Sequence, residues 1–132
     1  MAESRVVVVV AAIVEEDGRF LLSRRLAGTH LAGTWEFPGG KCEAGETHDA
    51  CLVRELREEL GVGAVVGREL LVTEHAYAER TVRLHFRRCA LDGPPQAMLG
   101  QQIRWVSPGE LRSIEFPAAD REVVELLTAQ SR

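Results

Sequence analysis

The chain has 132 residues, of which 45% are apolar and 27% charged, and its formal net charge is −4. This length suits one domain with a substantial core, so we expect a single domain over residues 1–132. The net negative charge argues against a general surface for nucleic acid polymers.

The first predicted element is a strand. Residues 6–14 form a valine-rich run that is too short to span a bilayer and is followed by acidic residues instead of a signal-peptide cleavage site, so we expect no membrane association. A continuous apolar run of valines is typical of a strand buried on both faces. Asp17-Gly18 then predicts a hairpin turn, and residues 19–25 a second strand.

A loop and a helix follow. Residues 27–34 are small and glycine-rich, which predicts a loop, and residues 35–40 predict a short extended piece. Thr47 is a typical N-cap and Gly61 a typical stop signal, so we expect a helix from about Thr47 to Leu60. The apolar residues expected to face the core from this helix are Val53, Leu56 and Leu60.

The second half of the chain begins with a predicted β-hairpin. Three glycines, Gly61, Gly63 and Gly67, indicate a flexible turn, after which residues 68–76 and 81–91 predict two strands around residues 78–80. In the second of these strands apolar and polar side chains alternate, which is typical of one solvent-exposed face. The apolar set is Val82, Leu84 and Phe86, and the polar set is Arg83, His85 and Arg87.

The remaining elements are short. Residues 96–102 predict a polar loop and residues 103–106 a strand. Ser107-Pro108 is typical of a helix start, and Asp120 is expected to cap a last helix that runs to about Ala129. Strands with one helix inside the chain and one at its end indicate an α/β fold, with a mixed sheet between two helical layers.

The three cysteines are Cys42, Cys51 and Cys89. They are odd in number and follow no metal-binding spacing, so we expect reduced thiols and a cytoplasmic protein. Cys42 is interpreted as a passive small residue rather than a redox sensor.

Three carboxylates on the central helix carry the strongest chemical signal. Glu55, Glu58 and Glu59 are spaced i, i+3 and i+4, so they converge on one patch and repel each other. Taken alone, this spacing is also typical of a solvated acidic face. Hard oxygen ligands in such a patch suit Mg²⁺, with Mn²⁺ as the alternative, held together with substrate phosphate oxygens.

The surrounding residues match a known motif, the Nudix box. It consists here of Gly40, five residues, Glu46, seven residues, Arg54-Glu55, apolar Leu56, one residue, Glu58-Glu59, one residue, Gly61 and apolar Val62. The chain therefore resembles a Nudix hydrolase, an α/β/α sandwich that hydrolyses a nucleoside diphosphate linked to a further group. The resemblance implies metal ligands at Glu55, Glu58, Glu59 and the Gly39 carbonyl. It also implies a supporting ion pair between Arg54 and Glu46, which act with Glu58 and Glu59 in catalysis.

Flanking segments resemble the MutT-like nucleoside triphosphate pyrophosphohydrolases. They are Arg24-Arg25, His30, residues 35–40, Glu79-Arg80 and residues 116–120. By this resemblance Arg25 and Arg80 hold phosphates with His30 nearby, Phe37 lines the base pocket, and Asp120 reads the base. The alternatives are that each arginine is a surface residue, that His30 is a solvated loop residue, that Phe37 is a core aromatic beside Trp35, and that Asp120 is only a helix cap.

The loop before the predicted strand 103–106 departs from the family pattern. MutT-like chains often have a glutamate there, whereas this chain has no carboxylate between Asp92 and Glu110, and Leu99 occupies that place. The general base is therefore left open between Glu58, Glu46 and a metal-activated water without a dedicated base.

We expect a metal-dependent hydrolase that cleaves a nucleoside triphosphate to a monophosphate and pyrophosphate, acting on a small nucleotide as a monomer or homodimer. An ionised Asp120 accepts hydrogen bonds only, which suits the N4 amine of cytosine and repels O6 of 8-oxoguanine. This favours CTP or dCTP, with 8-oxo-dGTP second. The alternatives are hydrolysis of ADP-ribose or a dinucleoside polyphosphate, and a catalytically silent nucleotide sensor.

Overall fold

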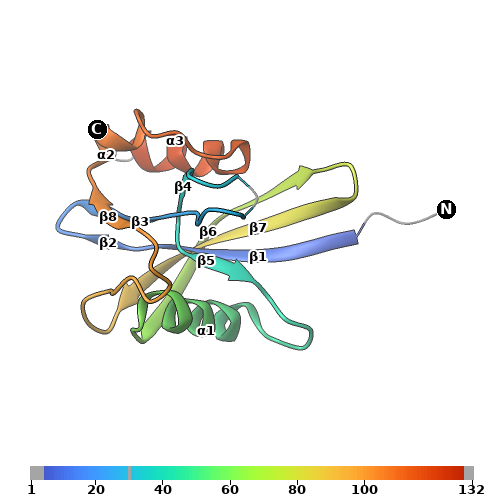
Figure 1. Ribbon diagram of the computed structural model, residues 1–132, viewed down its shortest axis with the longest axis horizontal. Helices are drawn as coiled ribbons and strands as arrows, with labels where there is room; N and C mark the ends of the chain where they lie inside the picture. Colours follow the sequence, from blue (N-terminus) through green and yellow to red (C-terminus); the bar gives the residue numbers. More distant parts are fainter. Residues whose placement is uncertain (1–4, 30, 130–132) are drawn as a thin grey trace.

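The computed structural model describes residues 5–29 and 31–129. Two four-stranded sheets lie between helical layers (Figure 1). The first sheet has the order β5-β1-β7-β6, with bounds β5 Gly39–Lys41, β1 Arg5–Ile13, β7 Arg80–Leu91 and β6 Ala64–Ala76. Because β1 and β7 run parallel and the other pairs antiparallel, this sheet is mixed, as predicted.

The second sheet, which the sequence did not indicate, is antiparallel. In it β3 (Arg19–Arg24) pairs with β2 (Glu15–Glu16), with β4 (Trp35–Glu36) and with β8 (Ile103–Val106). The predicted turn at Asp17-Gly18 joins β2 to β3 and has positive φ at both residues, as such a turn requires.

The helices lie on opposite sides of the sheets. Helix α1 (His48–Leu60) covers one side, and α2 (Pro108–Leu111), the 3₁₀ turn η1 (Ala118–Asp120) and α3 (Arg121–Ala129) cover the other (Figure 1). Their apolar faces form two cores that meet at the sheets. The core under α1 includes Leu52, Leu56 and Val10, and the core under α3 includes Phe86 and Leu127. The predicted α/β/α arrangement is confirmed.

Two local expectations were wrong. The core-facing row of α1 is Leu52, Leu56 and Leu60, with Cys51 beside it, whereas Val53 is only half-buried because it lies off this row. Strand β6 begins at Ala64 instead of residue 68, so Gly67 lies inside the strand. The β6–β7 pairing is irregular on both sides of Glu69, which identifies a β-bulge in place of the expected flexible turn.

Candidate active site

Helix α1 is held at both ends by local contacts. The Ala50 amide donates to Thr47 Oγ1 at 3.1 Å, which confirms the predicted N-cap. At the other end Gly61 has a left-handed conformation, with φ of 67°, and its amide donates to the Arg57 carbonyl. These fixed ends set the orientation of the acidic side chains between them.

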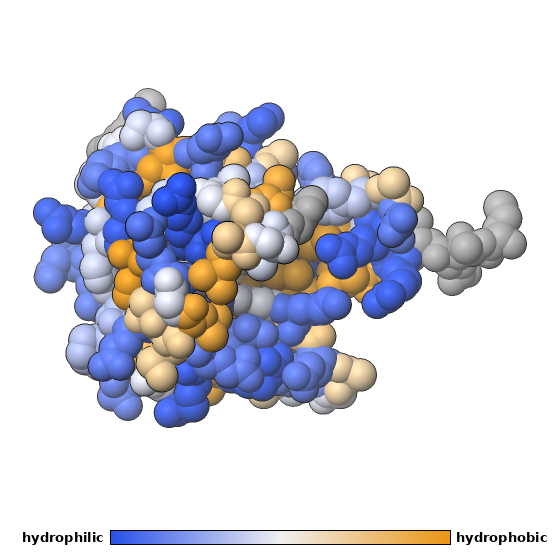
Figure 2. Space-filling view, in the orientation of Figure 1, coloured by the Kyte–Doolittle hydropathy of each residue, from blue (hydrophilic) through white to orange (hydrophobic). Residues whose placement is uncertain are grey.

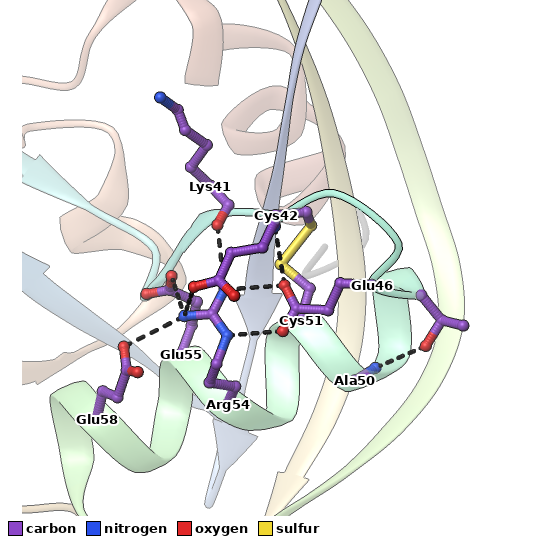
Figure 3. A network of polar contacts seen from close by, with 10 residues as sticks. Lys41, Cys42, Glu46, Ala50, Cys51, Arg54, Glu55 and Glu58 are labelled. Atoms are coloured by element: carbon purple, nitrogen blue, oxygen red, sulfur yellow. Dashed lines mark hydrogen bonds and ion pairs between the residues drawn. A yellow bond between two sulfur atoms is a disulfide. The ribbon is translucent and has the colours of Figure 1, made fainter.

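Arg54 is the centre of a polar network (Figure 3). Its Nε and Nη2 donate to the two Glu46 oxygens at 2.6 and 2.9 Å, a bidentate pair. Its Nη1 donates to Glu55 at 3.0 Å and to Glu58 at 3.3 Å, and Nη2 also donates to the Lys41 carbonyl. One guanidinium therefore links the loop before α1 to two of the acidic side chains on the helix.

This network changes the acidity of its members. The hydrogen bonds from Arg54, followed by the one from the Glu43 amide, lower the pKa of Glu46 to about 2. The hydrogen bond to Glu46 in turn raises the pKa of Arg54. The pair is therefore ionised throughout the physiological pH range, and Glu46 is a weak base.

The other carboxylates show the opposite shift. Burial, and then the charge of Glu55, raises the pKa of Glu59 to about 8. Burial also raises the pKa of Glu55, although Arg54 opposes the shift. Glu58 is exposed. Glu55 and Glu59 are half-buried, repel each other and lie beside Glu58. A divalent cation would relieve this repulsion, so these residues fit a bound metal ion.

Glycines bring the neighbouring strand against this acidic face. The Gly39 amide donates to Glu59 Oε2 at 3.1 Å. A Cβ on Gly40 would overlap the Glu55 carboxyl group, and one on Gly39 would overlap the Val10 backbone. Only glycine allows β5 to lie both beside β1 and against the glutamates, which explains the paired glycines better than their backbone freedom does.

The loop of residues 96–102 is anchored on the end of α1. Gln101 is buried, and its Nε2 donates to the Glu59 carbonyl at 2.8 Å, while its Oε1 accepts from the Leu99 amide. The Met98 amide donates to the same carbonyl at 3.1 Å. The sequence analysis gave Gln101 no role, although its contacts fix the backbone of a predicted metal ligand. The Leu99 side chain is 52% exposed.

A cavity of about 370 Å³ lies next to the glycine pair. The lining residues that bear on function are Arg25, Glu36, Phe37, Gly39, Gly40, Lys41, Tyr77, Arg80 and Asp120. The structure thus brings the predicted phosphate and base residues from four separate segments to one cavity, and this size suits a small ligand. His30, the remaining predicted substrate residue, lies outside the described residues.

The acidic groups of the cavity are largely desolvated. Burial, followed by the charge of Glu36, raises the pKa of Asp120 to about 7, and Arg25 opposes the shift. Burial likewise raises the pKa of Glu36, although Arg25 Nη1 donates to it at 2.9 Å. The sequence analysis assigned no role to Glu36, Lys41 or Tyr77. The one sequence feature that could have pointed to a place at the cavity is that Glu36 lies between the aromatic residues 35 and 37.

Asp120 is not the helix cap that we predicted. It ends η1 and precedes the first residue of α3, and its carboxyl group has no hydrogen bond to any residue that the structure describes. Asp120 thus stands directly before α3 without capping it by a side-chain hydrogen bond to the described residues, and it lines the cavity instead.

Phe37 lies at the border between the core and the cavity. It is buried in the α3 core, where it stacks on Phe116 at 5.5 Å and meets Phe86 edge-on, and it also lines the cavity. On the face of the molecule seen in Figure 2, apolar side chains gather around a central hollow with hydrophilic side chains above and below it. The apolar wall beside charged groups is suited to a base attached to a phosphate chain.

The cysteines correct the sequence analysis. Cys42 and Cys51 form a disulfide, with their Cα atoms 5.3 Å apart, and Cys89 is free and buried. Cys42 is therefore not a passive small residue, and two of the three thiols are paired. The expectation failed because the two cysteines are nine positions apart, with loop and helix start between them, and only the folded loop brings them together.

Two further observations concern the chain as a whole. No helix among the described residues is long and apolar enough to span a membrane. A family profile for the NUDIX domain matches residues 9–126.

Known proteins resemble the chain over most of its length. It is 40% identical over 120 residues to the CTP pyrophosphohydrolase of Escherichia coli K12, a match that covers 90% of this chain and 87% of that protein. It is 34% identical over 121 residues to the 8-oxo-dGTP diphosphatase of the same organism, covering 91% and 94%. The solution structure of the E. coli ORF135 protein superposes with a TM-score of 0.86 and 39% identity, covering 97% of this chain and 92% of that one.

Proposed function

Because this chain belongs to the Nudix family of hydrolases, we propose that it is a MutT-like pyrophosphohydrolase that cleaves a nucleoside triphosphate to a monophosphate and pyrophosphate. The observation that carries this proposal is the cavity, which has the glycine pair next to the acidic helix on one side and Arg25, Arg80 and Asp120 around it. We propose a single domain over residues 1–132, of which the family match covers residues 9–126.

Nudix hydrolases use divalent metal ions, and for this chain we propose Mg²⁺, with Mn²⁺ as the alternative. Glu55, Glu58, Glu59 and the Gly39 carbonyl would hold it. When bound, the ion neutralises charge on the phosphate oxygens. Arg54 orients Glu55 and Glu58 through its hydrogen bonds, and the Gly39 amide orients Glu59.

Two arginines and a histidine are proposed to bind the phosphates. Arg80 lines the cavity, and its guanidinium makes no hydrogen bond or ion pair within the part of the chain that the structure describes, so it is available to a phosphate. Arg25 also lines the cavity and pairs with Glu36, which holds its guanidinium there. Bidentate hydrogen bonds from arginine suit phosphate oxygens. His30 completes the proposed set.

The reaction adds water across a P–O–P bond of the triphosphate. The water oxygen bonds to one phosphorus, the bond to the pyrophosphate oxygen breaks, and one proton is released at neutral pH. Glu58 is favoured over Glu46 as the residue that accepts this proton, because Glu46 is held by Arg54 with a pKa of about 2. A metal-activated water without a dedicated base is the remaining alternative.

Asp120 is proposed to read the base, and Phe37 to form the apolar wall beside it. Asp120 is buried at the cavity and leaves its hydrogen-bonding capacity to a ligand, which supports this role. We propose CTP or dCTP as the preferred substrate, with 8-oxo-dGTP second. The relatives named for CTP and for 8-oxo-dGTP support a nucleoside triphosphate over ADP-ribose, a dinucleoside polyphosphate or a silent sensor.

Pyrophosphate release tests the proposal. The protein with Mg²⁺ is incubated with CTP, dCTP, dGTP, 8-oxo-dGTP, ADP-ribose and a dinucleoside polyphosphate, and phosphate is measured after pyrophosphatase is added. We expect release from the triphosphates, highest for CTP or dCTP, and none without pyrophosphatase. ADP-ribose and the dinucleoside polyphosphate release no pyrophosphate when they are cleaved, so their products are separated by chromatography. Turnover of ADP-ribose alone would contradict the proposed substrate class, and nucleotide binding measured by calorimetry without turnover of any nucleotide would identify a sensor.

A further inference from the structure

A second cluster of metal-binding side chains lies at the start of α1. It consists of His48, the first residue of α1, Glu69 of β6 and His85 of β7. One nitrogen or oxygen atom of each lies within 4.8 Å of those of the other two. The His85 Nδ1 is 2.5 Å from Glu69 Oε1, and the two imidazole rings are 4.3 Å apart between centroids.

The sheet determines where these side chains point. Leu84 and Phe86 of β7 are buried in the core under α3, so His85 between them faces α1 on the other side of the sheet. Glu69 pairs with Arg87 next to the bulge in β6, and such irregularities redirect side chains. Three separate elements thus present their polar groups to one point, and this arrangement does not depend on a flexible loop.

The charges around the cluster are balanced. Asp49, which follows His48, pairs with Arg87 at 3.0 Å, and Arg87 also donates to the Gly67 carbonyl. With neutral imidazoles the cluster has one negative charge, that of Glu69. The positive end of the α1 dipole opposes a cation here, and the Glu69 carboxylate is the charge that attracts one. The His85 side chain is only 12% exposed, so a ligand there is partly shielded from water.

We propose that His48, Glu69 and His85 bind a transition-metal ion of the Zn²⁺ type. Two imidazoles and one carboxylate are a donor set that Zn²⁺ uses, with a fourth position left for water. At Zn–N bonds of about 2.0–2.1 Å, two ligands of one tetrahedral ion lie roughly 3.3 Å apart. The contact between His85 and Glu69 opens by less than about 1 Å when the ion replaces the proton they share.

The site is separate from the acidic patch of the same helix. Glu55 lies seven positions after His48 along α1, which corresponds to roughly 10 Å of rise. The donors also differ, because Mg²⁺ prefers oxygen ligands and makes little use of imidazole. An ion at the new site would join the start of α1 to β6 and β7, so it would bind the folded chain only and raise its melting temperature.

Cobalt and zinc titrations test the proposal without any nucleotide. The full chain is saturated with Mg²⁺ to occupy the carboxylates, and Co²⁺ binding is followed by visible absorption and Zn²⁺ affinity by competition with a chelating dye. We expect one equivalent bound with the spectrum of nitrogen and oxygen ligands. In His48→Ala and Glu69→Gln the affinity for Zn²⁺ should fall at least about 100-fold. The loss of a residue that only supports a metal ligand can already cost that much, and these residues are proposed as the ligands themselves.

His75→Ala is the matched control, because His75 lies on β6 outside the cluster and contacts Tyr77. Its affinity should equal that of the wild type. Unchanged affinity in His48→Ala and Glu69→Gln would overturn the proposal. So would cobalt binding that requires reduction of the Cys42–Cys51 disulfide, shows a thiolate-to-cobalt absorption band and is lost in Cys42→Ser, because the ion would then bind at Cys42, Glu46 and Cys51. Absence of any Co²⁺ or Zn²⁺ binding would identify a hydrogen-bonded His–Glu pair only.

Discussion

Glu59 shows how one side chain combines a structural contact with a proposed metal-binding role. It accepts a hydrogen bond from the Gly39 amide, and its own carbonyl accepts from Gln101 and Met98. Gly39 therefore fixes the side chain, and Gln101 and Met98 fix the backbone, next to Glu55. Such a position suits a metal ligand, because the geometry exists before the ion arrives.

Replacing Glu59 with glutamine should remove most activity and leave the fold intact. The amide oxygen still accepts from Gly39, and the loss of a partly buried charge does not destabilise the chain. We expect kcat at saturating Mg²⁺ to fall below about a tenth of the wild-type value, a barrier increase above about 1.4 kcal/mol. Glu122→Gln, an exposed change on α3, is the control. Retention of higher activity would remove Glu59 from the metal ligands.

Asp120 should determine the choice of base. Asparagine both donates and accepts, so Asp120→Asn should pair with O6 and N7–H of 8-oxoguanine. We expect the ratio of kcat/KM for 8-oxo-dGTP to that for dCTP to rise about tenfold or more when measured at pH 8.5, where wild-type Asp120 is ionised. Asp92→Asn, an exposed change, is the control. An unchanged ratio would show that Asp120 does not contact the base.

At the scale of elements, the loop before α1 is held more firmly than its sequence indicates. The Cys42–Cys51 disulfide closes it, and the Arg54–Glu46 pair ties it to the helix. Both contacts restrain the segment that follows the glycine pair. The loop of residues 96–102 is similarly attached to the other end of α1 by Gln101.

Reduction of the disulfide should lower stability. A closed loop of this length stabilises the folded state by about 3 kcal/mol, chiefly by restricting the unfolded chain. We expect Cys42→Ser to lower the free energy of unfolding in urea by about 3 kcal/mol. The free energy of unfolding of this variant should not change when reductant is added. In the folded chain Cys89 does not react with the disulfide, because burial raises the pKa of its thiol to about 12. Titration of the denatured wild type should find one thiol before reduction and three after it, and equal stability with and without reductant would contradict the prediction.

A carboxylate in the loop of residues 96–102 should assist the site. The Leu99 side chain is exposed, while its amide is fixed by Gln101, so Leu99→Glu should leave the loop intact. We expect a higher kcat or a lower Mg²⁺ concentration for half-maximal rate. Met98→Glu, at the exposed neighbouring position, is the comparison. No change in either quantity would show that position 99 does not reach the metal site.

At the scale of the whole molecule, folding brings acidic groups into surroundings that disfavour their charge. The pKa values of Glu36, Glu59 and Asp120 all rise, with burial as the main cause. The folded chain without metal therefore binds more protons than the unfolded chain at intermediate pH. Stability consequently depends on pH in a direction opposite to that of an ordinary salt-bridged carboxylate.

This dependence can be measured at Asp120, whose pKa rises from 3.8 to about 7. Below pH 3.8 the group is protonated in both states, so it has no effect. Between the two values the unfolded chain ionises first, so stability falls as pH rises, by about 1.4 kcal/mol per pH unit for full coupling. Urea unfolding with a chelator should show that Asp120→Asn gains stability over the wild type between pH 4 and 7 and keeps it above. A constant difference would contradict the raised pKa.

Features that depend on neighbours in the sequence were predictable from the sequence. The spacing of Glu55, Glu58 and Glu59 places them on one side of any helix, and Thr47 and Gly61 define where that helix begins and ends, because these signals act within one or two turns. The alternation in residues 82–87 likewise separated the two faces of β7. The expected solvent exposure of the polar face was wrong for His85 and Arg87, because the start of α1 covers them.

Features that depend on distance through space were decided only by the tertiary structure. The pairing of Cys42 with Cys51, the second sheet, and the approach of Arg25, Glu36 and Asp120 to one cavity all require segments to pack together. The pKa values of Glu36 and Asp120 also depend on the tertiary structure. Desolvation comes from the atoms that surround a group in space and not from its neighbours in the chain. Asp120 thus looked like a helix cap in the sequence, whereas in the fold it is buried at the end of η1 and lines the cavity.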